Sequence, residues 1–475
     1  MKKTVNHILA AGLLALLSLA SCTDEFIEGN DLQGVDRDKR VEVRLPFGVG
    51  RGITTTITTR AAGGEIDYDS QLSGVMAFVY EAKSDNPEEN ELLAYHLFSN
   101  PSNKPLEGAT GGWIADNDDP TCGEIKFYVP VGDVYIYLLG NAQSSFLNFF
   151  PGVSGGDALG TQAEFFEKAT PKWNGNIHSV DGYLPLTGMV NNNTGLCHVN
   201  EQGQISYTDE EGKTHTLLPD GKHDEDNSFV LKRLMSKITM NIREGKGVKF
   251  TARDYTVRHI PHYVSPTAQA WTEEERDRIL VEDAKPVNFG LLDSLTFTIY
   301  LPENIRKVRP GVEITEYRQR DKVVKTADNK NTEETAPDDF HADNADNHKG
   351  HYKFEFAPKA STYIELTGWF ENADKTVAAD VRYYIHLGNF GKDLNHFSVE
   401  RDHHYTYNVT INGVDDIVVE VEDENEKTPG AEGVVFKHEA FAHIDAHFDQ
   451  VEMKFMRKDI EKGVYLYTDT PFGVM

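Results

Sequence analysis

Short segments rich in Val, Ile, Thr, Tyr and Phe recur along the chain, separated by clusters of Gly, Asn, Asp and Pro. This pattern predicts many short β-strands. Helix signals are rare: Thr272 and Glu275 have capping-box spacing, and Gln162–Lys168 is a second short candidate. Many strands with few helices predict an all-β fold of two tandem antiparallel β-sandwich domains. The expected strands are Val41–Phe47, Ile53–Thr59, Val75–Tyr80, Leu92–Phe98, Ile125–Val129, Val134–Leu139, Phe229–Ile242, Leu295–Leu301, Tyr352–Phe356, Thr362–Phe370, Val381–Leu387, Tyr405–Ile411 and Ile417–Val421.

Polar stretches mark the expected domain boundaries. Residues 200–227 interrupt the series of strands, so we expect an N-terminal sandwich over 41–228 and a C-terminal sandwich over 229–425. Residues 426–475 are expected to form the start of a further β unit or a donor-strand tail, with a shortened end. The most polar stretch, 318–350, is expected to be an exposed insertion.

The first 21 residues have the organisation of a secretory signal peptide. Two lysines precede a thirteen-residue apolar run, Ile8–Ala20, which is too short to span a bilayer. The run ends in Leu19-Ala20-Ser21-Cys22, a bacterial lipoprotein pattern, so we expect a signal peptide over 1–21 and lipidation of Cys22. Ordinary signal-peptidase cleavage is the alternative. Residues 22–40 are polar and are expected to be a tether.

Charge and hydropathy exclude two further classes of protein. The 475 residues include 47 Lys and Arg against 76 Asp and Glu, a net charge of −29. A field of that sign repels phosphate backbones, so we expect no nucleic-acid partner. Beyond the signal region no apolar run approaches the ~20 residues that a membrane-spanning helix needs. We therefore expect a lipid anchor as the only attachment to a membrane.

Candidate catalytic and metal-binding motifs are few. His443, Asp445 and His447 share one face of a strand, but no fourth ligand is evident, so we predict no metal. Residues 116–119 resemble the start of a calcium loop, but Pro120 and the lack of a Glu at position 12 exclude an EF-hand and leave only casual surface calcium. His-Glu-x-x-His and phosphate-binding glycine loops are missing from the sequence. We expect no enzyme activity and no cofactor.

Besides Cys22, the chain has two cysteines, Cys122 and Cys197. They would be exported to a potentially oxidising compartment, but they are 75 positions apart and have no spacing signature. We predict two thiols, with a disulfide as the alternative.

Seven phrases follow one another between residues 57 and 413: ITTRAA (57–62), YLLGNA (137–142), LKRLMSKI (231–238), LPEN (301–304), TYIELTG (362–368), HLG (386–388) and VERDHHYTYNVTING (399–413). In this order they resemble the fimbrillin-type lipoproteins of Bacteroidales, the subunits of type V pili. The similarity is greatest to the minor or tip subunits that carry a domain of unknown function, DUF4906. One departure is Asp402, where Asn is more usual.

The resemblance implies a mechanism of assembly. In this family the first strand of the N-terminal sandwich is removed by an Arg-specific surface protease, and a strand of a neighbouring subunit then fills the groove. For this chain the resemblance implies cleavage between Arg60 and Ala61. A permanent first strand in a subunit that keeps its anchor is the alternative. The segment before Arg60 is β-branched, and the face of it that has apolar anchors for exchange is Ile53, Thr55, Ile57 and Thr59.

We therefore expect a structural or adhesive fimbrial subunit at the cell outer membrane and surface. Its expected partners are other pilus subunits, the outer membrane through the lipid anchor, the Arg-specific protease, and host or bacterial glycans or proteins. The alternative is a surface lipoprotein that binds glycans or host ligands without polymerising. Its candidate stacking platforms, which are also typical core residues, are Trp113, Trp173, Trp271 and Trp369.

Overall fold

The computed structural model describes residues 36–50, 71–101, 112–115, 121–142, 146–148, 159–168, 171–178, 183–190, 195–209, 211–218, 228–266, 280–291, 295–308, 311–325, 339–341, 351–391, 393–414, 417–423 and 434–435. The chain divides into two compact units. The first comprises Met1–Met235 with Tyr263–Glu273, and the second comprises Ser236–His262 with Glu274–Met475. In the described part of the chain, no helix is long and apolar enough to cross a membrane.

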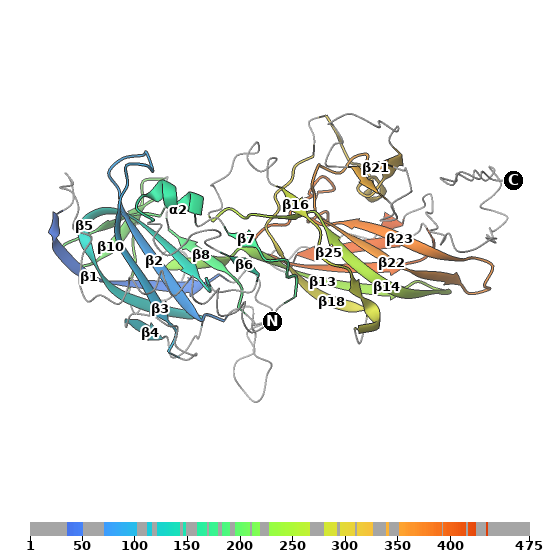
Figure 1. The fold of residues 1–475 in the computed structure, drawn as a ribbon, viewed down its shortest axis with the longest axis horizontal. Coiled ribbons are helices and arrows are strands. Elements are labelled where there is room, and N and C mark those ends of the chain that lie inside the picture. The colour runs from blue at the N-terminus through green and yellow to red at the C-terminus, as the bar shows by residue number, and fades with distance from the viewer. Residues whose placement is uncertain are drawn as a thin grey trace, which may run out of the picture. The chain divides into compact units, whose positions relative to one another are not determined.

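The first unit is built almost entirely from strands (Figure 1). Its short helix α2 (Gln162–Lys168) confirms one of the two predicted helices. The strands are β1 (Asp36–Val49), β2 (Gly74–Glu81), β3 (Leu92–Ser99), β4 (Trp113–Ala115), β5 (Cys122–Gly140), β6 (Leu147–Asn148), β7 (Lys172–Trp173), β8 (Leu186–Met189), β9 (Leu196–Val199), β10 (Ile205–Thr208), β11 (Thr214–Thr216) and β12 (Phe229–Arg233).

The long strand β5 organises this unit. Its first half pairs antiparallel with β1, and its second half pairs antiparallel with β2 and β9. Because β1 and β8 both pair with β5 and are joined through β12, the sheet closes around an apolar interior. That interior contains the inward side chains of β1, β2, β5 and β12, among them Val43, Val75, Ile136 and Leu231.

The second unit is also built from strands, joined by short 3₁₀ turns (Figure 1). Its described elements are β13 (Met235–Glu244), β14 (Val248–Arg258), β15 (Ile260–Pro261), β16 (Val281–Glu282), β17 (Val287–Asn288), η3 (Phe289–Leu291), β18 (Thr296–Pro302), η4 (Tyr317–Gln319), β19 (Val323–Lys325), β20 (Asp339–His341), β21 (His351–Phe354), β22 (Tyr363–Asn372), β23 (Ala378–His386), β24 (His404–Ile411), β25 (Ile417–Asp423) and β26 (Val434–Val435).

Two sheets form the body of the second unit. One has the order β18-β13-β24-β25-β26, and the other has the order β17-β14-β22-β23. Tyr255 of β14 stacks on Phe297 of β18 with ring centroids 3.9 Å apart, so the sheets face one another through aromatic side chains. Two facing sheets are a β-sandwich, and the all-β fold class that the sequence predicts is confirmed.

The domain boundary differs from the predicted one. The sequence predicts one strand over Phe229–Ile242 that begins the second domain. The structure instead ends β12 at Arg233, pairs it with β1 and β8 in the first unit, and starts β13 at Met235. The strand breaks at Leu234, whose backbone N–H donates to the carbonyl of Pro185 in the first unit. The buried positions change from odd-numbered residues in β12 to even-numbered residues in β13, so the alternation shifts phase at the break.

The polar stretch 318–350 is not simply an exposed insertion. Arg320 is fully buried, and β19 follows it and pairs with β21. A second apolar cluster forms here, in which Ile314 and Phe354 pack with Tyr384 of β23. Composition misses this burial because the enclosing residues come from other parts of the chain. The predicted helix start at Thr272 lies outside the described residues.

Candidate functional site

The first described strand in the sequence is β1. Its inward side chains are buried in the fold of the first unit. Its apolar residues alternate, as a strand with one face in the core requires. Val43, Leu45 and Phe47 have no exposed surface. The outward residue Glu42, which precedes Val43, is exposed. The N-terminal strand is therefore part of the core of the first unit.

Two neighbouring strands, β5 and β12, hold β1 in place. It pairs antiparallel with β5 from Arg40 opposite Pro130 to Gly48 opposite Cys122. From Phe47 onward it also pairs in parallel with β12, beginning with Phe47 opposite Phe229. Removing β1 would leave backbone donors and acceptors of both β5 and β12 without their partners, which is the situation that strand addition relieves.

A buried guanidinium fastens the end of β1. Arg233 of β12 is fully buried, and its Nη1 donates to the carbonyl oxygen of Gly50 at 2.7 Å. The backbone N–H of Gly50 in turn donates to the carbonyl of Leu231 at 2.8 Å. A bond from a buried cation to a carbonyl is stronger than a neutral one. The chain is therefore fixed at the point where β1 ends.

An ion pair fixes the outer side of β1. Arg44 Nη2 lies 2.6 Å from Oε2 of Glu124 on β5. The Glu124 side chain is only 6% exposed, whereas that of Arg44 is 32% exposed. A carboxylate that is so nearly buried needs a cation beside it, because burial penalises an uncompensated charge. Glu124 therefore depends on a basic residue supplied by the strand that lies against β5.

An aromatic pocket receives the last inward side chain of β1. The Phe47 ring meets Trp113 of β4 edge-to-face, with centroids 4.9 Å apart. Opposite Phe47 in the register is Gly123, and a Cβ built there would lie 3.1 Å from Phe47 Cζ. Gly123 thus leaves the room that the ring occupies.

The burial on β1 can be compared with the stability of a domain. Burying three large apolar side chains is worth about 5–9 kcal/mol, at roughly 1.5–3 kcal/mol each. The net stability of a whole domain is only about 5–15 kcal/mol. The first unit would therefore lose most of its stability with β1 unless another strand took its place.

Most of the predicted site residues follow β1 in the sequence, and Cys22 precedes it. Arg60 and Ala61, the strand residues Ile53, Thr55, Ile57 and Thr59, and the lipidation residue Cys22 are all outside the described residues. The described strand nearest to Arg60 on its N-terminal side is β1, which ends at Val49. Cleavage at Arg60 would therefore sever β1 as well as the predicted strand. The alternation of apolar residues from Val41 to Phe47 predicts β1 as a strand. The exchanged strand, by contrast, is predicted from its proximity to Arg60.

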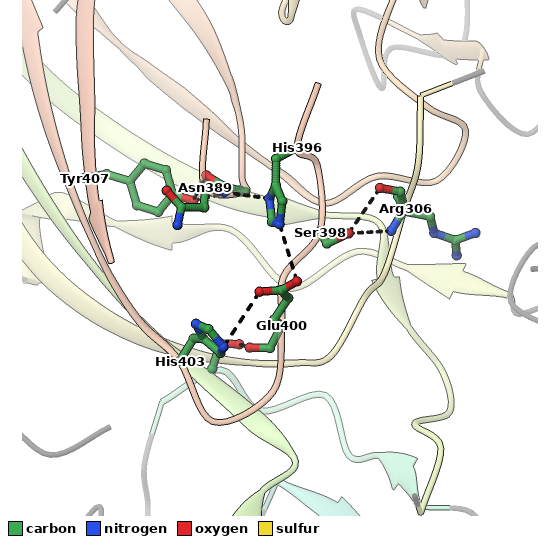
Figure 2. A network of polar contacts seen from close by, with 9 residues as sticks. Arg306, Asn389, His396, Ser398, Glu400, His403 and Tyr407 are labelled. Atoms are coloured by element: carbon green, nitrogen blue, oxygen red, sulfur yellow. Dashed lines mark hydrogen bonds and ion pairs between the residues drawn. The ribbon is translucent and has the colours of Figure 1, made fainter. Parts of the chain in front are cut away.

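A network of polar contacts braces the connection between β23 and β24 in the second unit (Figure 2). The backbone N–H of Asn389 donates to His396 Nδ1 at 2.8 Å, so the neutral ring carries its proton on Nε2. That atom faces Glu400 Oε1 at 3.4 Å, and His403 Nε2 lies 3.7 Å from Glu400 Oε2. The hydrogen bond from His396, together with the charges of His396 and His403, lowers the pKa of Glu400.

This network is structural in character. Because His396 Nε2 carries a proton, it has no lone pair to offer a metal ion. Within the described residues, no group of three or more His, Cys, Asp or Glu is arranged to hold a metal. Two further contacts tie down the same connection: Ser398 bonds both backbone groups of Arg306, and the Tyr407 hydroxyl bonds both backbone groups of Gly388. His443, Asp445 and His447 lie outside the described residues.

A second buried polar cluster centres on Arg320. Its guanidinium lies 3.9 Å from the centroid of the Phe397 ring and donates to the carbonyls of Leu387 and Leu394. Beside it, His386 Nδ1 lies 2.7 Å from Asp321 Oδ1. Burial lowers the pKa of His386 despite this carboxylate, so the ring is neutral at pH 7. The cluster fastens the segment around η4 to β23.

The tryptophans and cysteines are placed as follows. Trp173 is buried, Trp113 is half-buried against the core, and Trp271 lies outside the described residues. Trp369 of β22 is 42% exposed. Cys122 and Cys197 are both buried and do not form a disulfide, which confirms the prediction of two thiols.

Residues 299–409 match the family model described as "Domain of unknown function (DUF4906)". The matched residues lie within the second unit. The match confirms the DUF4906 similarity that the sequence predicts. The DUF4906 match runs from β18 to β24 and includes both the Arg320 cluster and the network around Glu400.

Several solved structures are similar to this chain. The tip fimbrial protein Mfa3 of Porphyromonas gingivalis, with a C-terminal truncation, has 14% identity and a TM-score of 0.39, covering 81% of this chain and 99% of that one. A candidate cell adhesion protein of Parabacteroides distasonis has 10% identity and a TM-score of 0.41, covering 84% and 97%. A candidate polysaccharide-binding protein (DUF1812) of Bacteroides thetaiotaomicron has 10% identity and a TM-score of 0.30, covering 81% and 100%. No protein with a curated description matches the chain.

Proposed function

We propose that this chain is an exported lipoprotein that serves as a structural or adhesive fimbrial subunit on the outer membrane. In this proposal it is anchored through Cys22 and assembles by strand exchange after a surface protease cuts at Arg60. The observation that carries the proposal is the burial of β1, with Val43, Leu45 and Phe47 fully enclosed at the N-terminal end of the fold. A strand that is both terminal and essential to a core can be removed by one cut and must then be replaced.

The lipid anchor and the cut fit together in sequence. Cys22 precedes β1, and Arg60 follows it. One cleavage at Arg60 would release both the anchor and the strand, so detachment from the membrane and readiness for assembly would arise together. Partners would be other subunits that donate or accept a strand.

The experiment compares the surface protein with two variants. For the wild type, we expect mass spectrometry of surface-extracted protein to find Ala61 at the N-terminus. Arg60→Ala should keep the acylated Cys22 N-terminus and remain a folded, membrane-held monomer. Arg51→Ala is the matched control, since Arg51 also follows β1, and it should be processed and assembled as the wild type is. Incorporation of Arg60→Ala into surface fibres at the wild-type level would refute cleavage-dependent exchange at this position.

A second candidate function, glycan binding without polymerisation, is favoured by Trp369. Its indole is exposed on β22, opposite Thr251 of β14 and Asp380 of β23, and Asp380 is ion-paired with Arg253. An exposed aromatic face flanked by polar groups suits the stacking of a sugar ring. Trp369→Ala should then abolish glycan retention on an array, while Tyr128→Ala, which removes an exposed tyrosine of the first unit, should not.

A further inference from the structure

The groove that β1 fills places specific demands on any strand that replaces it. Resting on the proposed function, we propose that the replacing strand is a segment of a neighbouring subunit with a defined pattern. It carries apolar residues at the positions of Val43 and Leu45, Lys or Arg at the position of Arg44, and an aromatic residue at the position of Phe47. This pattern determines which chain can replace β1. Glu124 is the residue that favours a positive charge at the position of Arg44.

The requirement for a basic residue at the position of Arg44 comes from β5. Glu124 is 4% exposed and has Arg44 as its cation at 2.6 Å. Directly opposite Arg44 in the register is Lys126, a like charge that by itself disfavours a basic residue at this position. Glu124 lies beside this position and offsets that repulsion for a basic residue. An acidic residue there would face a nearly buried carboxylate, which is strongly unfavourable.

The requirement for an aromatic residue at the position of Phe47 comes from the end of the groove. Trp113 presents its edge to the Phe47 ring, and Gly123 lies beneath that ring without a side chain. A Cβ on Gly123 would lie 3.1 Å from Phe47 Cζ, so glycine at this position leaves room for a ring from the incoming strand. A smaller side chain would leave a cavity lined by Trp113 and Phe229.

The backbone contacts keep these positions in register. A Cβ built on Gly203 would overlap the carbonyl oxygen of Glu42, so the occupant's backbone runs in close contact with the turn between β9 and β10. At the other end, Arg233 binds the carbonyl of Gly50. Both contacts are made to backbone groups and hold whichever strand lies there. The position of Arg44 in the incoming strand therefore always lies beside Glu124, and the position of Phe47 always lies in the aromatic pocket.

The experiment uses the full mature chain with a specific protease recognition sequence in place of residues 60–65. After cleavage, fluorescent peptides of residues 36–50 are added, and their incorporation is followed by fluorescence anisotropy. The peptides have the natural sequence or carry Arg44→Glu or Phe47→Ala. We expect the natural peptide to be incorporated and each altered peptide to bind about tenfold or more weakly. In a Glu124→Lys chain the order of the natural and Arg44→Glu peptides should reverse.

A Glu124→Gln chain provides a second test of the charge preference if the Glu124→Lys chain does not fold. With Lys126 left opposite, it should prefer the Arg44→Glu peptide to the natural one. Equal incorporation of the natural and Arg44→Glu peptides into the wild-type chain would overturn the pattern while leaving strand exchange intact. Failure of the natural peptide to enter any of the cleaved chains would overturn strand exchange itself, and the pattern with it.

Discussion

Arg233 and Gly50 are 183 residues apart in sequence and are joined by a hydrogen bond of 2.7 Å from the guanidinium to the carbonyl oxygen. The arginine is fully buried on β12, and the glycine immediately follows the end of β1. Arg233 lies in one of the segments that carry the family resemblance. Its physical role is to join the first strand to the last strand of the same unit.

Arg233→Met should loosen this fastening. It leaves the carbonyl of Gly50 without its charged donor, and a hydrogen bond to a charged group is worth about 1.5–3 kcal/mol. We expect the free energy of unfolding of the first unit to fall by about that amount in urea denaturation. Lys232→Met is the control because Lys232 is exposed on the same strand, and it should change stability by less than about 0.5 kcal/mol. Equal effects of the two substitutions would contradict the role of Arg233.

Phe47→Ala should be among the most damaging single changes in β1. The ring is fully buried against Trp113, and truncation of a buried Phe typically costs about 3–5 kcal/mol. Tyr128→Ala on β5 removes an aromatic ring of similar size that is 56% exposed, and we expect little change. Thermal unfolding followed by tryptophan fluorescence distinguishes the two. A Phe47→Ala protein as stable as the wild type would show that β1 is dispensable.

Cys122 should report the loss of β1. It pairs with Gly48 of β1 in the register and is 9% exposed, so the strand covers it. Cys197 pairs with Val134, away from β1, and burial raises the pKa of its thiol, which makes it unreactive. Release of β1 should therefore make Cys122 react with a maleimide while Cys197 stays protected. Mass spectrometry of the labelled peptides measures this, and simultaneous labelling of both would indicate unfolding of the whole unit instead.

The second unit should lose stability in mild acid. Burial lowers the pKa of His259 to about 4 and lowers that of His386 as well, whereas an unfolded histidine titrates near 6.5. Below pH 6.5 the unfolded chain takes up protons that the folded unit does not. Stability is therefore fully present above pH 6.5 and falls as the pH decreases toward 4. Urea midpoints at pH 7.5 and pH 5 test this.

His259→Asn is the matched variant for that test. The backbone φ of His259 is +58°, a conformation that Asn adopts readily. The variant should remain folded and lose less stability between pH 7.5 and pH 5 than the wild type does. An unchanged loss would show that other groups govern the acid sensitivity.

Arg320→Met should destabilise the second unit. Arg320 donates to the carbonyls of Leu387 and Leu394 and lies over the ring of Phe397. Met fills similar space but leaves buried carbonyls without donors, so we expect a loss of at least about 2 kcal/mol. Arg318→Met is the control, because the Arg318 side chain is 44% exposed and two positions away. Chemical denaturation compares them, and a fully stable Arg320→Met protein would contradict the structural role.

The strands were largely predictable from the sequence because alternation and β-branched residues report burial of one face directly. The two most consequential features were not. Arg233 and Arg320 look like surface residues by type, and their burial depends on carbonyls supplied by Gly50 and by Leu387 and Leu394, which are distant in sequence. The division of Phe229–Ile242 between two units likewise depends on long-range pairing.

The parallel pairing of β1 with β12 also sets the order of folding. β1 is the first described strand to be synthesised, but Phe229, the partner of Phe47, follows 182 residues later. Contacts of such sequence separation form slowly because a long loop must close first. The end of β1 from Phe47 onward therefore lacks its β12 partner until most of the first unit has been synthesised, whereas Val43 and Leu45 pair with the nearer strand β5. During that interval the end of the strand is open to premature pairing with another chain.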